Sequence, residues 1–523
     1  MKSAKNNTEN LIIHRYNMKY LLAFEGILVG IVAGSIAVIY RLALNFSEQN
    51  MKFVLSYAEA HHWAIVAWFG ALFIMALIVG RLVKWEPMIS GSGIPQVEGE
   101  LQGYFEASWI KVIIGKIIGG ILCIIGGLSL GREGPSVQLG AMGGKGFSRI
   151  FKRLNIEERY LMTCGASAGL AAAFNAPLAG VMFALEEVHK NFSSTVLFSA
   201  MTASITADFV SKYVFGLGSV FNFKVNASIP LKYYGFIILL GIILGAAGAF
   251  YNYVLVKTQD LYAKIKYLKV EFRPIIPFLM AGILGFTLPQ VLGGGHAMIE
   301  PLAGGKLGLG LMVGLLLVKF IFSMVSFGSG APGGIFFPLL VLGAYIGGIY
   351  GQVVVGNFGI DPQYINNFII IAMAGYFTAI VRAPITGIVL ITEMTGSLIH
   401  LLPLTVVAVA AEITADMLKS QPIYEVLLDR ILLKRGEEPI VDSKDKTLIA
   451  TVVHHGAHIE NCPISDIDWP EGCLLVSIRR GEKELIPNGA TLIYPSDTIV
   501  ALVNEADLSD VHAKMRELCG ESD

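Results

Sequence analysis

The sequence is poor in charge. Asp, Glu, Lys and Arg make up 15% of its 523 residues, against about 25% in average soluble proteins. Hydrophobic residues make up 54%, which excludes an intrinsically disordered chain and disfavours a cytosolic enzyme. The net charge of −1 leaves no basic surplus, so nucleic acid is not an expected partner. A lipid bilayer is the solvent that fits this composition.

Cysteine and metal-binding motifs are also scarce. The five cysteines form no Cys-x-x-Cys pair, a pattern more typical of membrane positions facing a reducing cytoplasm than of a disulfide framework. There is no His-Glu-x-x-His motif. The three histidines near Cys462 lack zinc-site spacing and are expected at the surface. We therefore expect a protein that is not an enzyme and uses neither a metal nor an organic cofactor.

Charge is distributed unevenly along the chain. From Ile431 onward 26 of 93 residues are charged, against 53 of the first 430. This predicts a membrane domain over 1–430 and a cytoplasmic domain over 431–523. Some apolar runs can span a bilayer core of about 30 Å, and others are broken by Gly and Pro. The long runs include 63–83, 233–256 and 307–327, and the broken ones 110–130, 162–185 and 369–391.

Broken helices exist at membrane depth only where protein buries them or where they line a cavity. They therefore indicate a transport pathway or, alternatively, a dense glycine-rich bundle.

The first apolar run, 20–44, predicts a retained membrane helix, because it is too long for the core of a signal peptide. Four basic residues precede it, at positions 2, 5, 15 and 19. The positive-inside tendency then places the N-terminus of a multi-pass cell-membrane protein in the cytoplasm.

An internal repeat supports transport. The segment 171–187 resembles 378–394 at an offset of 207, which aligns Glu186 with Glu393. Secondary transporters often consist of duplicated halves with the substrate site between them. The sequence leaves open whether these halves are parallel or inverted.

Three loops rich in Gly and Pro share one pattern: GSGIP at 91–95, GREGP at 131–135 and GSGAPGGIFFP at 328–338. Proline is favoured at the first helical position, and the N–H groups at a helix N-terminus attract anions. Such ends can hold an anion without a fixed positive charge, which would bind it too tightly for release.

GSGIP, GREGP and GIFFP, in this order, resemble the signature motifs of the CLC family of chloride channels and chloride/proton exchangers. AAAFNAPLAG at 171–180 and the Pro-x-Tyr pattern ending at Tyr424 extend the resemblance. It implies an all-α polytopic membrane protein built from inverted halves of tilted and broken helices. It also implies a homodimer with one pore in each subunit, and chloride and protons as the transported ions.

The resemblance further implies that Ser92 and Tyr424 bind chloride through their hydroxyls, and Ile335 and Phe336 through their backbone N–H groups. The serine at the second position of GSGIP resembles the residue that the chloride-preferring members of the family have there. Without the resemblance, Ser92 is equally well interpreted as a helix cap, and both roles are compatible.

The resemblance also implies roles for two acids. Glu133 would be the external gate and proton acceptor, and Glu187 the internal proton-transfer acid. Taken alone, Glu133 could be a surface acid beside Arg132, and Glu187 a solvated helix end. We expect a chloride/proton antiporter. The alternative is a passive, voltage- or ligand-gated chloride channel of the same fold.

Other polar residues in the body have structural interpretations. Glu98 and Lys116 are candidates for a buried ion pair, since an unpaired charge there would be costly, although Glu98 could instead cap a turn. Glu186 and Glu393 are expected to be structural. His296, after three glycines, is expected to be an exposed polar residue.

The sequence pattern after residue 430 predicts a small α/β domain. It would have strands at 473–480, 484–487 and 497–503 and a helix at 508–518. Its sequence resembles the TrkA-C (RCK-C) domain of potassium-uptake regulators. That resemblance implies a dimerising βαβ-type regulatory unit with a site for an unidentified small ligand. Arg479 and Arg480 lie on alternate sides of a strand and are not expected to share a site.

Overall fold

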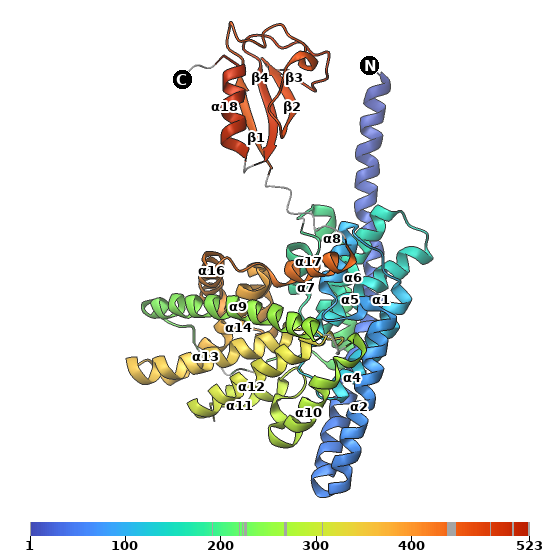
Figure 1. The fold of residues 1–523 in the computed structure, drawn as a ribbon, viewed down its shortest axis with the longest axis vertical. Coiled ribbons are helices and arrows are strands. Elements are labelled where there is room, and N and C mark those ends of the chain that lie inside the picture. The colour runs from blue at the N-terminus through green and yellow to red at the C-terminus, as the bar shows by residue number, and fades with distance from the viewer. Residues whose placement is uncertain are drawn as a thin grey trace. The chain divides into compact units, whose positions relative to one another are not determined.

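The computed structural model describes residues 2–190, 192–218, 220, 221, 223, 227–265, 269–305, 307–436, 446–481, 483–504 and 507–520, with only the backbone for 2–18. The chain divides into two compact units, Met1–Leu428 and Asp429–Asp523. The first is helical, and the second contains a β-sheet (Figure 1). Three of the four basic side chains used to orient the N-terminus lie outside the described side chains.

The first unit repeats one order of helices. Its first half contains α1 (Lys2–Ala60), α2 (His62–Trp85), α3 (Ile94–Gln102), α4 (Trp109–Ile125), α5 (Glu133–Ile150), α6 (Asn155–Phe174), α7 (Pro177–Phe183) and α8 (Ser194–Phe215). Its second half contains α9 (Tyr234–Lys264), α10 (Ile275–Thr287), α11 (His296–Ala303), α12 (Leu309–Gly328), α13 (Phe336–Phe358), α14 (Ile365–Val381), α15 (Pro384–Thr395) and α16 (Leu401–Met417). Helix α17 (Ile423–Arg435) follows.

Within the described residues, eight helical segments are long and apolar enough to cross a membrane, as expected for a multi-pass protein. The predicted run 20–44 lies within α1. Two predicted broken runs are divided between α6 and α7 and between α14 and α15. Each first helix ends at a left-handed residue, Asn175 (φ 55°) or Arg382 (φ 68°), and a proline starts the next helix two residues later. Proline cannot continue the preceding helix, so the chain turns there.

Glycine allows the helix backbones to touch. A side chain at Gly140 in α5 would overlap the carbonyl of Gly165 in α6, and one at Gly165 would overlap the carbonyl of Gly140. Gly144 meets the Leu161 carbonyl in the same way. Small residues allow such close approach where no hydrophobic force drives helices together. The 58 glycines of the chain thus serve packing as well as loops.

The two halves contact each other reciprocally. Glu186 accepts hydrogen bonds from the N–H groups of Ile385 and Thr386 at the start of α15 (3.2 and 2.8 Å). Glu393, its repeat counterpart, accepts them from Leu178 and Ala179 at the start of α7 (3.1 and 2.8 Å). Each acid therefore caps a helix of the other half, consistent with the predicted structural role. Reciprocal contacts are the signature of a two-fold relation.

Two buried lysines hold equivalent loops. Lys116 donates to the carbonyls of Ile89 and Gly91 (3.0 and 2.7 Å). Lys319, which is 203 residues later, donates to the carbonyls of Val291 and Gly293 (2.8 and 2.7 Å). The loop before α3 and the loop before α11 are therefore counterparts. Each also ends on a left-handed glycine, with φ of 92° and 100°.

The second unit contains a four-stranded sheet in the order β1-β4-β2-β3. Its strands are β1 (Lys446–Val452), β2 (Cys473–Arg480), β3 (Lys483–Leu485) and β4 (Thr498–Asn504). Helix α18 (Leu508–Leu518) contributes Val511 and Met515 to the core. The bounds predicted for β2 and α18 are confirmed, and β1 was missed.

All three described strand pairings of this sheet are antiparallel. The βαβ-type arrangement implied by the resemblance is therefore wrong, because such a unit needs a parallel pair of strands. Arg480 forms an ion pair with Asp497 (2.8 Å), which gives this arginine a structural role. Within the described residues, His, Cys, Asp and Glu form no group of three that could hold a metal.

Candidate anion and proton site

The three Gly/Pro loops meet in the first unit. Gly131 and Gly334 exchange both backbone hydrogen bonds, at 2.6 and 2.8 Å, as an isolated antiparallel bridge. The N–H group of Gly333 donates to the Gly91 carbonyl (3.0 Å). Three segments far apart in the sequence thus share one small network of backbone hydrogen bonds. The N-termini of α3, α5 and α13 begin beside it.

Two glycines allow this contact. A side chain at Gly131 would overlap the carboxylate of Glu133 and would lie 3.2 Å from the backbone nitrogen of Phe337. A side chain at Gly134 would lie 2.9 Å from the Ser92 Cβ. The GREGP loop therefore packs against both other loops through bare backbone, and Glu133 and Ser92 lie at those contacts.

Ser92 is buried. Its Oγ accepts a hydrogen bond from the Ile94 N–H at the start of α3 (3.3 Å), but the N-cap residue of this helix is Gly93, so Ser92 is not the helix cap. A hydroxyl that accepts one hydrogen bond can still donate another. The contact with Ile94 is therefore compatible with anion binding by Ser92.

Ile335 and Phe336 lie at the start of α13. The Leu339 N–H makes an early bond of this helix, to the Ile335 carbonyl (3.0 Å). The N–H groups at this end precede the intrahelical ladder and carry the positive end of the helix dipole. The Phe336 ring packs between Phe174 and Phe377, with centroid distances of 5.1 and 4.7 Å. Aromatic side chains thus keep water away from this helix end.

Tyr424, in α17, is fully buried. Its hydroxyl has no hydrogen-bond partner within the described chain. It lies within electrostatic range of both Glu187 and Glu133. A buried hydroxyl of this kind can donate a hydrogen bond to an anion.

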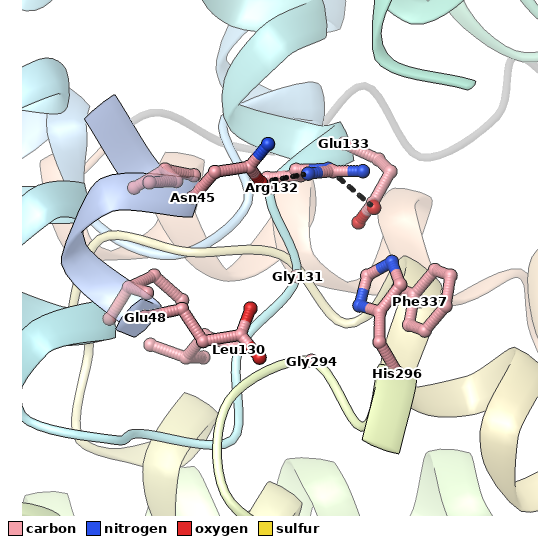
Figure 2. A pocket seen from close by; sticks show the side chains of 11 residues that line it. Asn45, Glu48, Leu130, Gly131, Arg132, Glu133, Gly294, His296 and Phe337 are labelled. Carbon is pink, nitrogen blue, oxygen red and sulfur yellow. Dashed lines mark hydrogen bonds and ion pairs between the residues drawn. The ribbon is translucent and has the colours of Figure 1, made fainter. Parts of the chain in front are cut away.

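Glu133 begins α5 and is 0% exposed, so it is not a surface acid. The Arg132 Nε lies 3.8 Å from its Oε1. Neither carboxylate oxygen has a hydrogen-bond partner among the described residues. Figure 2 shows this carboxylate above the ring of His296, at one side of a small cavity.

Glu187 lies in a π-helical segment, Ala184–Val188, that continues α7. It is 3% exposed, so it is not a solvated helix end. Its Oε1 has no hydrogen-bond partner in the described chain. π-Helical turns often mark functional positions. Here the wider π-helical turn contains the buried acid Glu187.

The predicted pair between Glu98 and Lys116 is wrong. Glu98 pairs with Lys190 (2.6 Å), which also pairs with Glu425 (2.5 Å), and Lys116 instead holds backbone carbonyls. A buried amine can be satisfied by carbonyl oxygens as well as by an acid, and proximity in sequence does not decide between them. Lys190 and Glu425, near Glu187, were missed because 235 residues separate them.

The prediction that His296 is an exposed polar residue is also wrong. It is only partly exposed, and its Nε2 is buried without a hydrogen-bond partner in the described chain. The ring stacks on Phe337 with a centroid distance of 3.7 Å and an interplanar angle of 11°. The three glycines before it let the backbone enter the interior of the first unit instead of following its surface.

Broken helices whose N-terminal ends meet beside buried acids define a membrane-transport class of fold. Comparison with known families then identifies the family: residues 70–416 match the model described as voltage gated chloride channel. The chain belongs to this family. Residues 448–516 match the model of the TrkA-C domain.

Curated relatives cover most of the chain. The H(+)/Cl(-) exchange transporter ClcA of Yersinia pestis bv. Antiqua (strain Angola) is 32% identical over 467 residues, which is 86% of this chain and 94% of that protein. The protein of the same name from Vibrio cholerae serotype O1 (strain ATCC 39541 / Classical Ogawa 395 / O395) is 34% identical over 437 residues, 81% of this chain and 92% of the relative.

Solved structures share the fold. The crystal structure of a slow cyanobacterial Cl⁻/H⁺ antiporter superposes with a TM-score of 0.75 at 28% identity, and covers 80% of this chain and 99% of that one. A eukaryotic CLC transporter superposes with a TM-score of 0.67 at 22% identity, over 86% of this chain and 82% of that chain. The predicted CLC fold is confirmed.

Proposed function

We propose that the protein exchanges chloride for protons across the cell membrane. The observation that carries this proposal is the Glu133 carboxylate, which is buried where the three Gly/Pro loops meet. An ionised acid there competes with an anion for the same helix ends, and a protonated acid does not. Its protonation therefore links anion passage to proton transfer. The names of the curated relatives support the same activity.

In this proposal the hydroxyls of Ser92 and Tyr424 and the backbone N–H groups of Ile335 and Phe336 bind chloride. The burial of both hydroxyls and the position of the two N–H groups at the start of α13, before the intrahelical hydrogen bonds, support it. All four donors are neutral. An anion held by neutral donors is bound weakly enough to leave, as conduction requires.

Glu187 is the internal proton-transfer acid in this scheme. Its burial supports this role, because an intramembrane ionisable residue is costly and is usually functional. It also favours an exchanger over the alternative, a passive chloride channel of the same fold, which has no need of a second buried acid. Protons would pass between Glu187 and Glu133, and chloride past Ser92 and Tyr424.

The wider assembly follows from the family resemblance. The protein would be a homodimer with one pathway in each subunit, with the N-terminus and the C-terminal domain in the cytoplasm. The TrkA-C-like unit, from about residue 431, would regulate transport by binding a small ligand of unknown identity. The membrane domain would comprise 1–430.

A flux assay tests the central claim. The full chain is reconstituted in liposomes, and chloride and proton movements are recorded together. An outward chloride gradient is expected to drive protons into the liposomes against their own gradient. Purely passive chloride flux without proton movement would favour the channel.

A further inference from the structure

A small cavity borders Glu133. It has a volume of about 30 Å³ and is lined by residues of α1, by the GREGP loop and by the loop before α11 (Figure 2). Buried polar atoms of three lining residues have no hydrogen-bond partner in the described chain: both oxygens of Glu133, the Nε of Arg132 and the Nε2 of His296. Buried polar atoms are nearly always satisfied. A polar cavity of this size suits about one or two water molecules that bridge such atoms.

His296 is held firmly in this cavity. Its ring stacks on Phe337, and Figure 2 shows the imidazole beneath the Glu133 carboxylate, with its nitrogens on the cavity side of Phe337. Stacking fixes the plane of the ring, and therefore the direction in which its nitrogens can donate or accept. A neutral imidazole has one nitrogen that accepts a proton and one that donates, so the ring can pass a proton on.

The repeat shows that this imidazole is a special feature of the second half. The loops held by Lys116 and Lys319 are counterparts at an offset of 202 residues, so His296 occupies the position of Ile94. The scaffold therefore accepts an apolar side chain at this position. The geometry of the loop therefore does not require a titratable residue at the position beside Glu133.

Charged groups from three elements surround the ring. The cavity reaches solvent at its rim, where Glu48 is 36% exposed and pairs with Lys52, itself 61% exposed. Burial, followed by the cations Arg132, Arg41, Lys319 and Lys52, lowers the pKa of His296 well below its usual value, so the ring is neutral except while it carries a proton. The acids that line the cavity with it are Glu48 from α1 and Glu133.

We propose that His296 passes protons between the solution at this rim and Glu133. The inference rests on the proposed exchange function. In the inward step, the neutral imidazole takes a proton from the solution at the rim, and the imidazolium that forms gives its Nε2 proton to a bridging water, which gives one of its own protons to a Glu133 carboxylate oxygen. The imidazole and the carboxyl group are then both neutral. The outward step is the reverse, and no other reactant is needed.

Substitution separates proton transfer from ring stacking. His296→Phe keeps a ring that can stack on Phe337 and removes both nitrogens, and His296→Gln keeps polarity without a nitrogen that can take up a proton. In liposomes containing the full chain, both variants are expected to exchange at least about tenfold more slowly, because positioned acid–base groups typically contribute 10²–10⁴-fold. His62→Phe, at the exposed start of α2, is the matched control.

Chemical rescue tests the mechanism directly. Imidazole added to the solution on the rim side is expected to restore exchange in His296→Gly, since the small molecule can replace the missing ring. A purely structural role for the histidine would give no rescue.

Failure of this inference can be distinguished from failure of the proposed function. If the unsubstituted protein moves no protons, the exchange function itself is wrong. If it does move them, wild-type exchange by His296→Phe at every pH would overturn the relay, as would the absence of rescue in His296→Gly.

Discussion

The two halves of the membrane body use one backbone arrangement for different chemistry. GREGP and GIFFP are counterparts at an offset of 203 residues, so Glu133 of the first half corresponds to Phe336 of the second. Gly131 and Gly334 correspond in the same way and bond to each other. Ser92 corresponds to Gly294 through the lysine-held loops. Both halves supply helix N-termini, but only the first adds a buried acid and a hydroxyl at these positions.

The comparison teaches that the helix ends and the titratable groups are separable parts of the design. The helix ends are set by glycine, proline and long-range backbone bonds, and are duplicated. The side chains to which we assign proton coupling are few and lie in unmatched positions. Substitutions can therefore test each part separately.

The largest effect is expected from Glu133→Gln. Glutamine has nearly the same shape but cannot carry a proton, so proton movement driven by a chloride gradient should fall to that of protein-free liposomes, while chloride still moves. Glu59→Gln, at the exposed end of α1, is the control and should keep normal coupling. Continued proton pumping by Glu133→Gln would refute the gate assignment.

The two buried lysines test whether the halves are equally dependent on their loop anchors. Lys116→Met and Lys319→Met each leave two carbonyls without a donor, and each should destabilise the protein by about 2–4 kcal/mol. Thermal unfolding in detergent measures this loss. Lys52→Met, which alters an exposed pair, should change little. A large loss in one lysine variant and none in the other would show that the two loops are not equivalent.

A smaller effect is expected from the reciprocal acids. Glu186→Ala and Glu393→Ala should each cost about 1–3 kcal/mol, because each removes the partner of two N–H groups. Glu186 also accepts a hydrogen bond from the Thr386 hydroxyl (2.7 Å), so its loss should be the larger in the same unfolding assay. In a Thr386→Val background the difference should disappear. A greater loss in Glu393→Ala would contradict this account.

The smallest effect is expected from Ser92→Ala, which makes the first loop more like the second. Loss of one neutral hydrogen bond to the anion should weaken chloride binding by about 1 kcal/mol, or about fivefold. Calorimetric titration with chloride measures the change. Ser56→Ala, at an exposed hydroxyl of α1, serves as the control, and unchanged affinity in Ser92→Ala would remove Ser92 from the binding site.

Much of the fold could be predicted because its signals are local. The Gly/Pro strings mark the starts of α3, α5 and α13, and Asn-Ala-Pro and Arg-Ala-Pro mark the breaks at Asn175 and Arg382. The repeat was visible where it preserves Ala-Pro and Glu. Each of these features depends on residues within one or two turns, which is the range over which backbone preferences act.

The remaining features depend on distant partners. Glu98 lies 92 residues before its partner Lys190, and Lys116 is satisfied by carbonyls whose positions no sequence motif reveals. The position of His296 was missed because GSGIP and GGGHA share little except glycine, so their equivalence appears only through the lysines that hold them. The predicted roles of the chloride-binding residues, Glu133 and Glu187 stay predictions until the flux measurements are made.

The bridge between Gly131 and Gly334 has a consequence for the origin of the molecule. A residue that bonds to its own counterpart makes the contact that two copies of a half-length chain would make with each other. Such a pair would already bring together two glycine-lined helix ends, before any acid or hydroxyl distinguished them. Fusion of the two copies into one gene then lets each half mutate alone, which is the condition under which one counterpart can be glutamate and the other phenylalanine.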